Sequence, residues 1–235
     1  MFIEFIYLVH MLKSLINVFF PQICYACHTH LNDFEQDICT HCRHNLPVTN
    51  FHFNQDDSVL KIFHGRVTIE NATALLRFEK KGKVQQLIHG LKYKGQERIG
   101  VFLGAWLGEE LKFVKAYQAI DLVIPVPLHK KKLKKRGYNQ VAKFAQEIAE
   151  ALNAQYVDDV LLKVSNTNSQ TLKNRFARWT NNDELFTLKN KNGIANKHIL
   201  LVDDLITTGA TMEACINVLN QAYNVKISIA AMAIA

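Results

Sequence analysis

The segment at residues 198–212, HILLVDDLITTGATM, constrains the fold of this chain more than any other. Its apolar run Ile199–Val202 predicts a strand that is buried on both faces, as in a parallel sheet covered by helices. Two acids and a small hydroxyl-rich turn follow, and we expect a helix from Met212 to Gln221. Because a strand that turns into a helix gathers backbone N–H groups at the positive end of the helix dipole, the segment predicts an anion site.

The residues of this turn also indicate which anion binds. Asp203 and Asp204 would repel a second phosphate, but their carboxylates accept hydrogen bonds from sugar hydroxyls. A phosphate beside a diol describes a ribose 5-phosphate. The plainer alternative is a buried strand followed by an acidic helix cap. In the first interpretation, the phosphate is held by Thr207, Thr208, Gly209 and Thr211.

The run LLVDDLITTGAT resembles the signature of the type I phosphoribosyltransferases, which bind phosphoribosyl pyrophosphate (PRPP). The resemblance implies that Asp203 and Asp204 hold the ribose hydroxyls, with Mg²⁺ bound chiefly by the diol and pyrophosphate oxygens of PRPP. It leaves the catalytic residues unknown, because in such a transfer the protein stabilises charge rather than supplying a nucleophile.

Length and charge suggest how the chain is divided. Its 235 residues can hold one α/β domain and a small appendage. Residues 1–60 carry a net charge of −4 against +7 for the whole chain, so residues 61–235 carry +11 and favour polyanionic partners. We expect an amphipathic helix at 1–20, a cysteine knuckle at 21–60 and a phosphoribosyltransferase-like α/β domain with a mainly parallel sheet at 61–235. For residues 1–20, a signal peptide or membrane anchor and a start at Met11 are the alternatives.

Four of the five cysteines form two C-x-x-C pairs, Cys24 with Cys27 and Cys39 with Cys42, separated by eleven residues. Two hairpin-like turns of this kind can present four thiolates to one tetrahedral ion, so we expect a structural zinc site. Disulfides are the weaker alternative, because no secretion signal is recognised. The fifth cysteine, Cys215, is expected to be a small buried apolar residue. Alternative ligands in the same segment are His28, His30, His41 and His44.

A second motif lies at 121–140, DLVIPVPLHKKKLKKRGYNQ. It predicts a buried strand from Leu122 to Val126, a loop with six basic residues in seven positions, and a helix at Asn139–Leu152. A loop that follows a core strand lies at the carboxyl edge of a parallel sheet, where ligands bind. We therefore expect Arg136 and part of the lysine cluster to bind a polyanion, although a solvated turn is the plainer alternative.

The remaining segments complete the expected sheet. Strands are expected at 155–163, 184–188 and 226–235. A polar stretch after the first of these is long for a structureless connection, which is typical of functional loops. Its basic residues, which can reach a phosphate or a nucleic-acid backbone, are Lys173, Arg175 and Arg178.

Five motifs occur here in one order: the cysteine knuckle, LKYKG (91–95), IPVPLH…KKRGYNQ (124–140), NSQTLKNR (168–175) and VDDLITTGAT. This order resembles the ComF family of competence-associated proteins, from about residue 12 onward. The resemblance implies a protein that handles incoming single-stranded DNA in natural transformation, in the cytoplasm or peripheral to the inner membrane near the DNA-uptake machinery. Residues implied to contact pyrophosphate or DNA backbone are His129, Lys130, Arg136, Lys173 and Arg175.

Lysines at 130–132, where the family usually has arginine, lose the bidentate grip on phosphate. This departure puts dependence on a single arginine there in doubt. Two functions therefore stay open, a DNA-uptake factor and a metabolic phosphoribosyltransferase of unknown acceptor, with a purely bridging protein as a third. The nine basic residues at 130–136 and 173–178 favour the first, since roughly two or three suffice for pyrophosphate. The intact turn at 203–211 favours the second, and enzymatic activity is left open.

Overall fold

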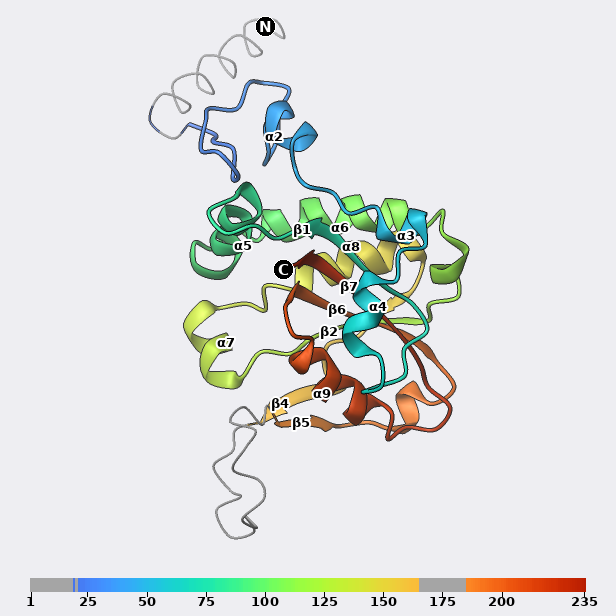
Figure 1. The fold of residues 1–235 in the computed structure, drawn as a ribbon. Coiled ribbons are helices and arrows are strands. Elements are labelled where there is room, and N and C mark those ends of the chain that lie inside the picture. Colours follow the sequence, from blue (N-terminus) through green and yellow to red (C-terminus); the bar gives the residue numbers. More distant parts are fainter. Residues whose placement is uncertain (1–18, 20, 165–184) are drawn as a thin grey trace, which may run out of the picture.

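The structure is a computed structural model that describes residue 19 and residues 21–164 and 185–235 (Figure 1). The expected helix at 1–20 and the polar stretch with Lys173 and Arg175 fall almost wholly outside the described residues. Within the described part of the chain, no helix has both the length and the apolar character needed to cross a membrane.

The centre of the fold is a five-stranded sheet with the order β1-β7-β6-β2-β3, in which every neighbouring pair is parallel. This confirms the mainly parallel α/β fold. The central strand β6 pairs with β2 on one side and β7 on the other. The strands are β1 (Ala72–Arg77), β2 (Leu122–Pro125), β3 (Gln155–Tyr156), β6 (His198–Ile206) and β7 (Lys226–Ile234).

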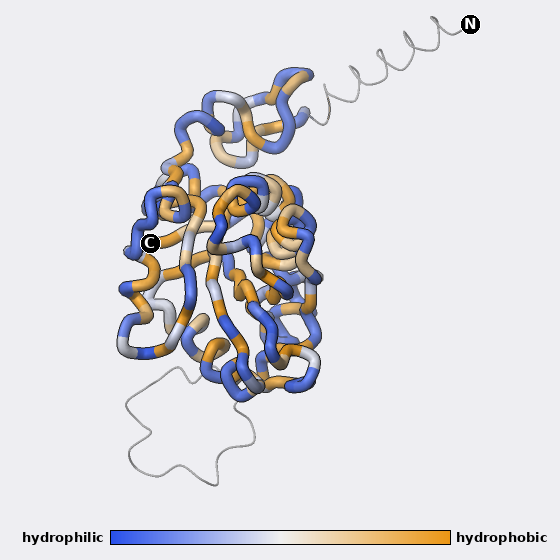
Figure 2. The backbone as a smooth tube through the Cα atoms, turned by 90° about the vertical axis from the view of Figure 1, so that its right-hand side faces the viewer, coloured by the Kyte–Doolittle hydropathy of each residue, from blue (hydrophilic) through white to orange (hydrophobic). Residues whose placement is uncertain are grey.

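Alternate side chains of β6 enter two separate cores. Leu200 and Val202 pack with helices α5 (Lys83–Tyr93), α6 (Arg98–Leu111) and α8 (Ala142–Leu152). Ile199 and Leu201 point the other way and pack with α4 (Ser58–Phe63) and α9 (Ala210–Leu219). Because a strand has a side-chain period of two, a strand with helices on both faces is apolar at every position. In Figure 2 the apolar segments of the backbone, drawn in orange, run through the sheet part of the molecule.

Helices α6 and α8 lie against each other at very short range. Gly104 makes this approach possible, because a Cβ at this position would lie 2.7 Å from the carbonyl oxygen of Phe144. Leu103, Leu107 and Leu111 are fully buried on the inner face of α6, whereas Phe102 and Trp106 on the same helix are only half-buried.

Two parts of the expected topology are wrong. The strand expected at 155–163 is broken, so that β3 joins the main sheet and β4 (Leu161–Val164) does not. Instead β4 pairs antiparallel with β5 (Leu185–Leu188), and the two form a separate ribbon. The strand expected at 184–188 therefore also lies outside the main sheet. The exposed acids Asp158 and Asp159 lie at the break, where their charged side chains favour solvent over a continued buried strand.

The basic run at 130–136 is also not a loop. It forms the helix α7 (Lys130–Arg136), which ends at Gly137 with a left-handed φ of 88°. Lysine and arginine are good helix formers, and glycine is the preferred residue at this position after a helix. The other short helices are α2 (Thr40–His44), α3 (Phe51–Asn54), η1 (Lys115–Tyr117) and η4 (Asn192–Ile194).

Residues 46–63 pack against the edge strand β1. Val48 bridges to Leu76, and the Thr49 hydroxyl donates to the carbonyl oxygen of Ala74. His52 is buried, with Nδ1 3.0 Å from the Thr73 hydroxyl and Nε2 3.1 Å from Glu110 Oε2 on α6. These contacts tie the segment to the sheet, while the division at 1–20, 21–60 and 61–235 stays a prediction.

Candidate ribose-phosphate site and metal site

The turn between β6 and α9 lies at the carboxyl edge of the sheet. Asp203 and Asp204 are still part of β6, which continues to Ile206, so the strand is longer than its apolar run. Thr207, Thr208 and Gly209 form the turn, and Thr211 lies in the first turn of α9. The backbone therefore brings the predicted phosphate residues together at a helix amino terminus, where N–H groups lack partners within the helix.

Gly209 is required at its position for two reasons. Its φ is 75°, in the left-handed region that glycine adopts without strain. A Cβ there would also lie 2.8 Å from the ring of Phe63 and 3.0 Å from Nη2 of Arg66. The turn is thus pressed against a segment that precedes β1.

Arg66 supports this turn from outside. Its Nη2 donates to the carbonyl oxygen of Thr208 at 2.9 Å, and its Nη1 lies 3.0 Å from Glu213 Oε2 on α9. Its guanidinium also lies 5.6 Å from the ring centroid of Phe63. A contact that fixes one carbonyl direction also fixes the neighbouring N–H directions, so Arg66 helps to set the geometry of the turn. Nothing in the sequence pattern singled out this residue.

Asp204 is 4% exposed and both of its carboxylate oxygens are engaged. Oδ1 lies 2.7 Å from Lys92 Nζ on α5, and Oδ2 accepts from Gln140 Nε2 at 2.6 Å. Gln140 in turn accepts from Arg136 Nη1 through its side-chain oxygen. Asp203 accepts from the backbone N–H of Asp204 at 2.8 Å. Lys92 and Gln140 are site residues that the sequence analysis missed, although both lie in motifs that it singled out.

Helix α7 places its basic residues beside this cluster, with Arg136 nearest to it. At the other end of α7, Nδ1 of His129 accepts from the backbone N–H of Lys131 at 3.2 Å, so His129 caps the helix. The five lysines of α7 are exposed. Of the predicted anion-contacting residues, the structure thus joins Arg136 to Asp204 through Gln140 and leaves Lys130 in solvent. Lys173 and Arg175 lie outside the described residues.

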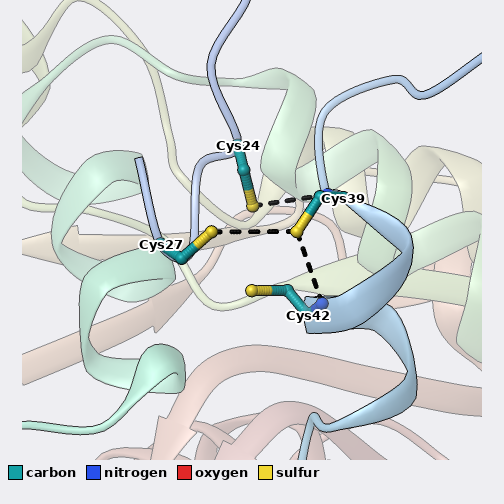
Figure 3. A group of neighbouring side chains, drawn as sticks. All are labelled: Cys24, Cys27, Cys39 and Cys42. Atoms are coloured by element: carbon teal, nitrogen blue, oxygen red, sulfur yellow. Dashed lines mark hydrogen bonds between the residues drawn. The ribbon is translucent and has the colours of Figure 1, made fainter. Parts of the chain in front are cut away.

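The four predicted metal ligands converge (Figure 3). Their sulfur atoms all lie within 4.8 Å of one another, with 3.7 Å between the Sγ atoms of Cys27 and Cys39. The second pair lies at the start of helix α2 rather than in a hairpin-like turn. The sulfur of Cys24 accepts a hydrogen bond from the backbone N–H of Cys39 at 3.3 Å, and the sulfur of Cys39 accepts one from the backbone N–H of Cys42 at 3.4 Å. Hydrogen bonds of this kind orient the ligands of metal sites. The neighbouring histidines are exposed outside the cluster: His28, His30, His41 and His44.

The thiols of this cluster have unequal acidities. Burial raises the pKa of Cys24 and of Cys42 above the ordinary value, whereas a hydrogen bond with the Thr29 hydroxyl lowers the pKa of Cys27 to about 6. Buried thiolates are stable only beside a cation, and a bound divalent metal supplies that charge. Four cysteines in this arrangement can bind a metal, and the donor set fits zinc. By contrast, Cys215 is fully buried in the core, as expected.

Comparison with known proteins indicates which class of protein the chain resembles. A family model described as "Phosphoribosyl transferase domain" matches residues 141–234, which include α8, β6, the turn and α9. This part of the chain is therefore similar to phosphoribosyltransferase domains, in agreement with its parallel sheet. A solved structure of glutamine PRPP amidotransferase from B. subtilis aligns with a TM-score of 0.38 at 21% identity, over 56% of this chain and 26% of that one.

The chain is, more particularly, similar to ComF-type competence proteins. It is 30% identical over 130 residues to "Competence protein F" of Haemophilus influenzae and 33% identical over 132 residues to "Competence protein ComFC" of Streptococcus pneumoniae. These matches cover 54% and 56% of this chain, and 57% and 54% of the relatives' lengths. A "DNA utilization protein" of Escherichia coli is 28% identical over 129 residues. The chain thus spans little more than half the length of these relatives.

Proposed function

We propose that this protein handles incoming single-stranded DNA during natural transformation, on a phosphoribosyltransferase-like scaffold that binds PRPP or a similar ribose 5-phosphate. The observation that carries the proposal is the position of the basic helix α7 directly beside the Asp203–Thr211 turn, to which Arg136 is joined through Gln140. The names of the homologues, competence and DNA utilization proteins, agree with it.

Each part of the site has a role in this proposal. Asp203, which is partly exposed, and Asp204 accept the ribose hydroxyls, and for the buried Asp204 the ligand has to displace Lys92 or Gln140 from its carboxylate. Mg²⁺ is held by the diol and pyrophosphate oxygens of PRPP. The turn with Thr207, Thr208, Gly209 and Thr211 holds the 5-phosphate through backbone N–H groups. The residues that contact pyrophosphate or DNA backbone phosphates are His129, Lys130, Arg136, Lys173 and Arg175.

The knuckle supports this core rather than taking part in chemistry. Four thiolates complete a tetrahedral zinc site and leave no open coordination position, so the ion holds a module too small for its own core. We further propose that the protein acts in the cytoplasm or at the periphery of the inner membrane, beside the uptake machinery that delivers the strand.

The alternative function is a metabolic phosphoribosyltransferase, and the complete Asp203–Thr211 turn favours it, because a pure DNA binder has no need of a ribose-phosphate site. In that case α7 serves pyrophosphate alone. DNA binding across salt distinguishes the two, since the salt dependence counts the phosphates that are neutralised.

The test is fluorescence anisotropy of a labelled single strand, titrated with the protein across a salt series with and without PRPP–Mg²⁺. Binding is expected to weaken steeply with salt, with a slope of about −0.7 per neutralised phosphate. Changing Lys131, Lys132 and Lys135 to Gln should flatten the slope by up to about 2 units. A matched control changes Lys112 and Lys115, exposed residues that precede β2 at the opposite edge of the sheet. Absence of binding at physiological salt would refute the DNA-handling proposal and favour the metabolic alternative.

A further inference from the structure

A second basic segment lies beside α7. Residues 80–94, which follow β1 and include α5, contain five lysines and no acid. Residues 129–140 contain six further basic residues and again no acid. Most of these side chains are exposed, and the lysines of the first segment are Lys80, Lys81, Lys83, Lys92 and Lys94. Two acid-free basic segments thus flank the carboxyl edge of the sheet.

The two segments meet at the end of α5. The Arg136 guanidinium lies 5.7 Å from the ring centroid of Tyr93, and the Tyr138 hydroxyl donates to the carbonyl oxygen of Leu91. Figure 1 shows α5 and α7 on the same side of the molecule. Since Lys92 pairs with Asp204, this junction adjoins the proposed ribose-phosphate site.

Tyr93 is not part of the buried core. It is the last residue of α5 and is 71% exposed. Its ring lies 4.9 Å from that of His89, one turn earlier, at an interplanar angle of 45°. An exposed aromatic ring beside a guanidinium, between two basic segments, is the arrangement that binds unpaired bases, because any base can stack on such a ring while its phosphates meet the lysines.

We propose that Tyr93 stacks on a base of single-stranded DNA whose backbone runs between the two basic segments, past the ribose-phosphate site. The inference rests on the proposed function and adds to it a base-contacting residue and a path for the strand. It also predicts a preference for single strands, because the bases of a duplex are stacked on one another and cannot reach the ring.

The experiment compares Tyr93→Ala, Tyr93→Phe and Tyr223→Ala by anisotropy with a fluorescent DNA oligonucleotide across salt. Tyr223 is the matched control, because it is 77% exposed but precedes β7, at the opposite edge of the sheet. Tyr93→Ala is expected to weaken binding about 5- to 150-fold with an unchanged salt slope, because stacking releases no counterions. Tyr93→Phe, which keeps a ring, should stay within about twofold of the unmodified protein.

Fluorescence of 2-aminopurine in the strand gives a second readout, since stacking on Tyr93 should quench it and Tyr93→Ala should restore it. If the unmodified protein binds DNA but Tyr93→Ala binds equally well, or no worse than Tyr223→Ala, the stacking proposal fails while the DNA-handling function stands. Equal affinity for a duplex would also overturn it. If the unmodified protein binds no DNA at all, the proposed function itself fails.

Discussion

The ion pair between Lys92 and Asp204 gives the sharpest test of the site, and Lys92→Met is the change to make. Methionine keeps most of the length of the lysine side chain but removes its charge. Asp204 would then remain as a buried carboxylate with Gln140 as its remaining side-chain donor among the contacts described above. We expect the variant to fold with a clearly lower free energy of unfolding.

The expected loss in the free energy of unfolding can be worked out from the geometry of the Lys92–Asp204 ion pair. At 2.7 Å and an effective dielectric constant of about 20, the attraction is about 6 kcal/mol. The cost of removing both charges from water offsets much of this attraction, and removing one partner of a buried pair typically costs about 3–5 kcal/mol. Since the Lys92 side chain is 24% exposed, we expect about 3 kcal/mol, near the lower end. For a chain of this size the melting temperature should fall by about 6–12 °C.

The assay is chemical and thermal denaturation of the full chain at constant zinc, arranged as a double-mutant cycle of Lys92→Met with Asp204→Asn. The double variant should be less destabilised than the sum of the single variants by about 2 kcal/mol. Lys94→Met, an exposed neighbour, is the control and should change stability by less than about 0.5 kcal/mol. Additive effects, or a Lys92→Met variant as stable as the control, would refute this account of the buried pair.

The remaining predictions concern the ligand, the metal and pH. Asp203→Asn should weaken PRPP binding by about tenfold or more with an unchanged melting temperature, and equal affinity in calorimetry would contradict the site. Metal analysis should find about one zinc per chain, and Cys39→Ser should expose the knuckle but not the core to protease. Burial lowers the pKa of His52 although Glu110 opposes this, so the unfolded chain takes up a proton first as pH falls. Stability should therefore decline below about pH 6.5, and His52→Gln should flatten the decline in denaturation curves.

The sequence alone was a sufficient guide where structure follows from neighbouring residues. The apolar run at 199–202 predicted a strand buried on both faces, and the C-x-x-C spacing predicted convergent thiols, both of which the structure has. It did not predict the pairing of the strand at 155–163, because a run of apolar and β-branched residues favours a strand but does not specify which other strand it pairs with. It also failed at 130–136, where charge suggested a loop although lysine and arginine favour a helix.

The amino-acid sequence by itself determined the parallel α/β class, the strand–turn–helix segment and the four-cysteine knuckle, because each depends on spacing within a short stretch of chain. Only the tertiary structure decided that Arg66 supports a turn 142 positions away, that Gln140 joins Arg136 to Asp204, and that Tyr93 lies beside the basic helix. Apart from the Arg136–Gln140 contact, which lies within one helical turn's spacing, these contacts join residues that are remote in the chain, and no local pattern encodes them. They arise only when the order and direction of the strands bring separate loops to the same edge of the sheet.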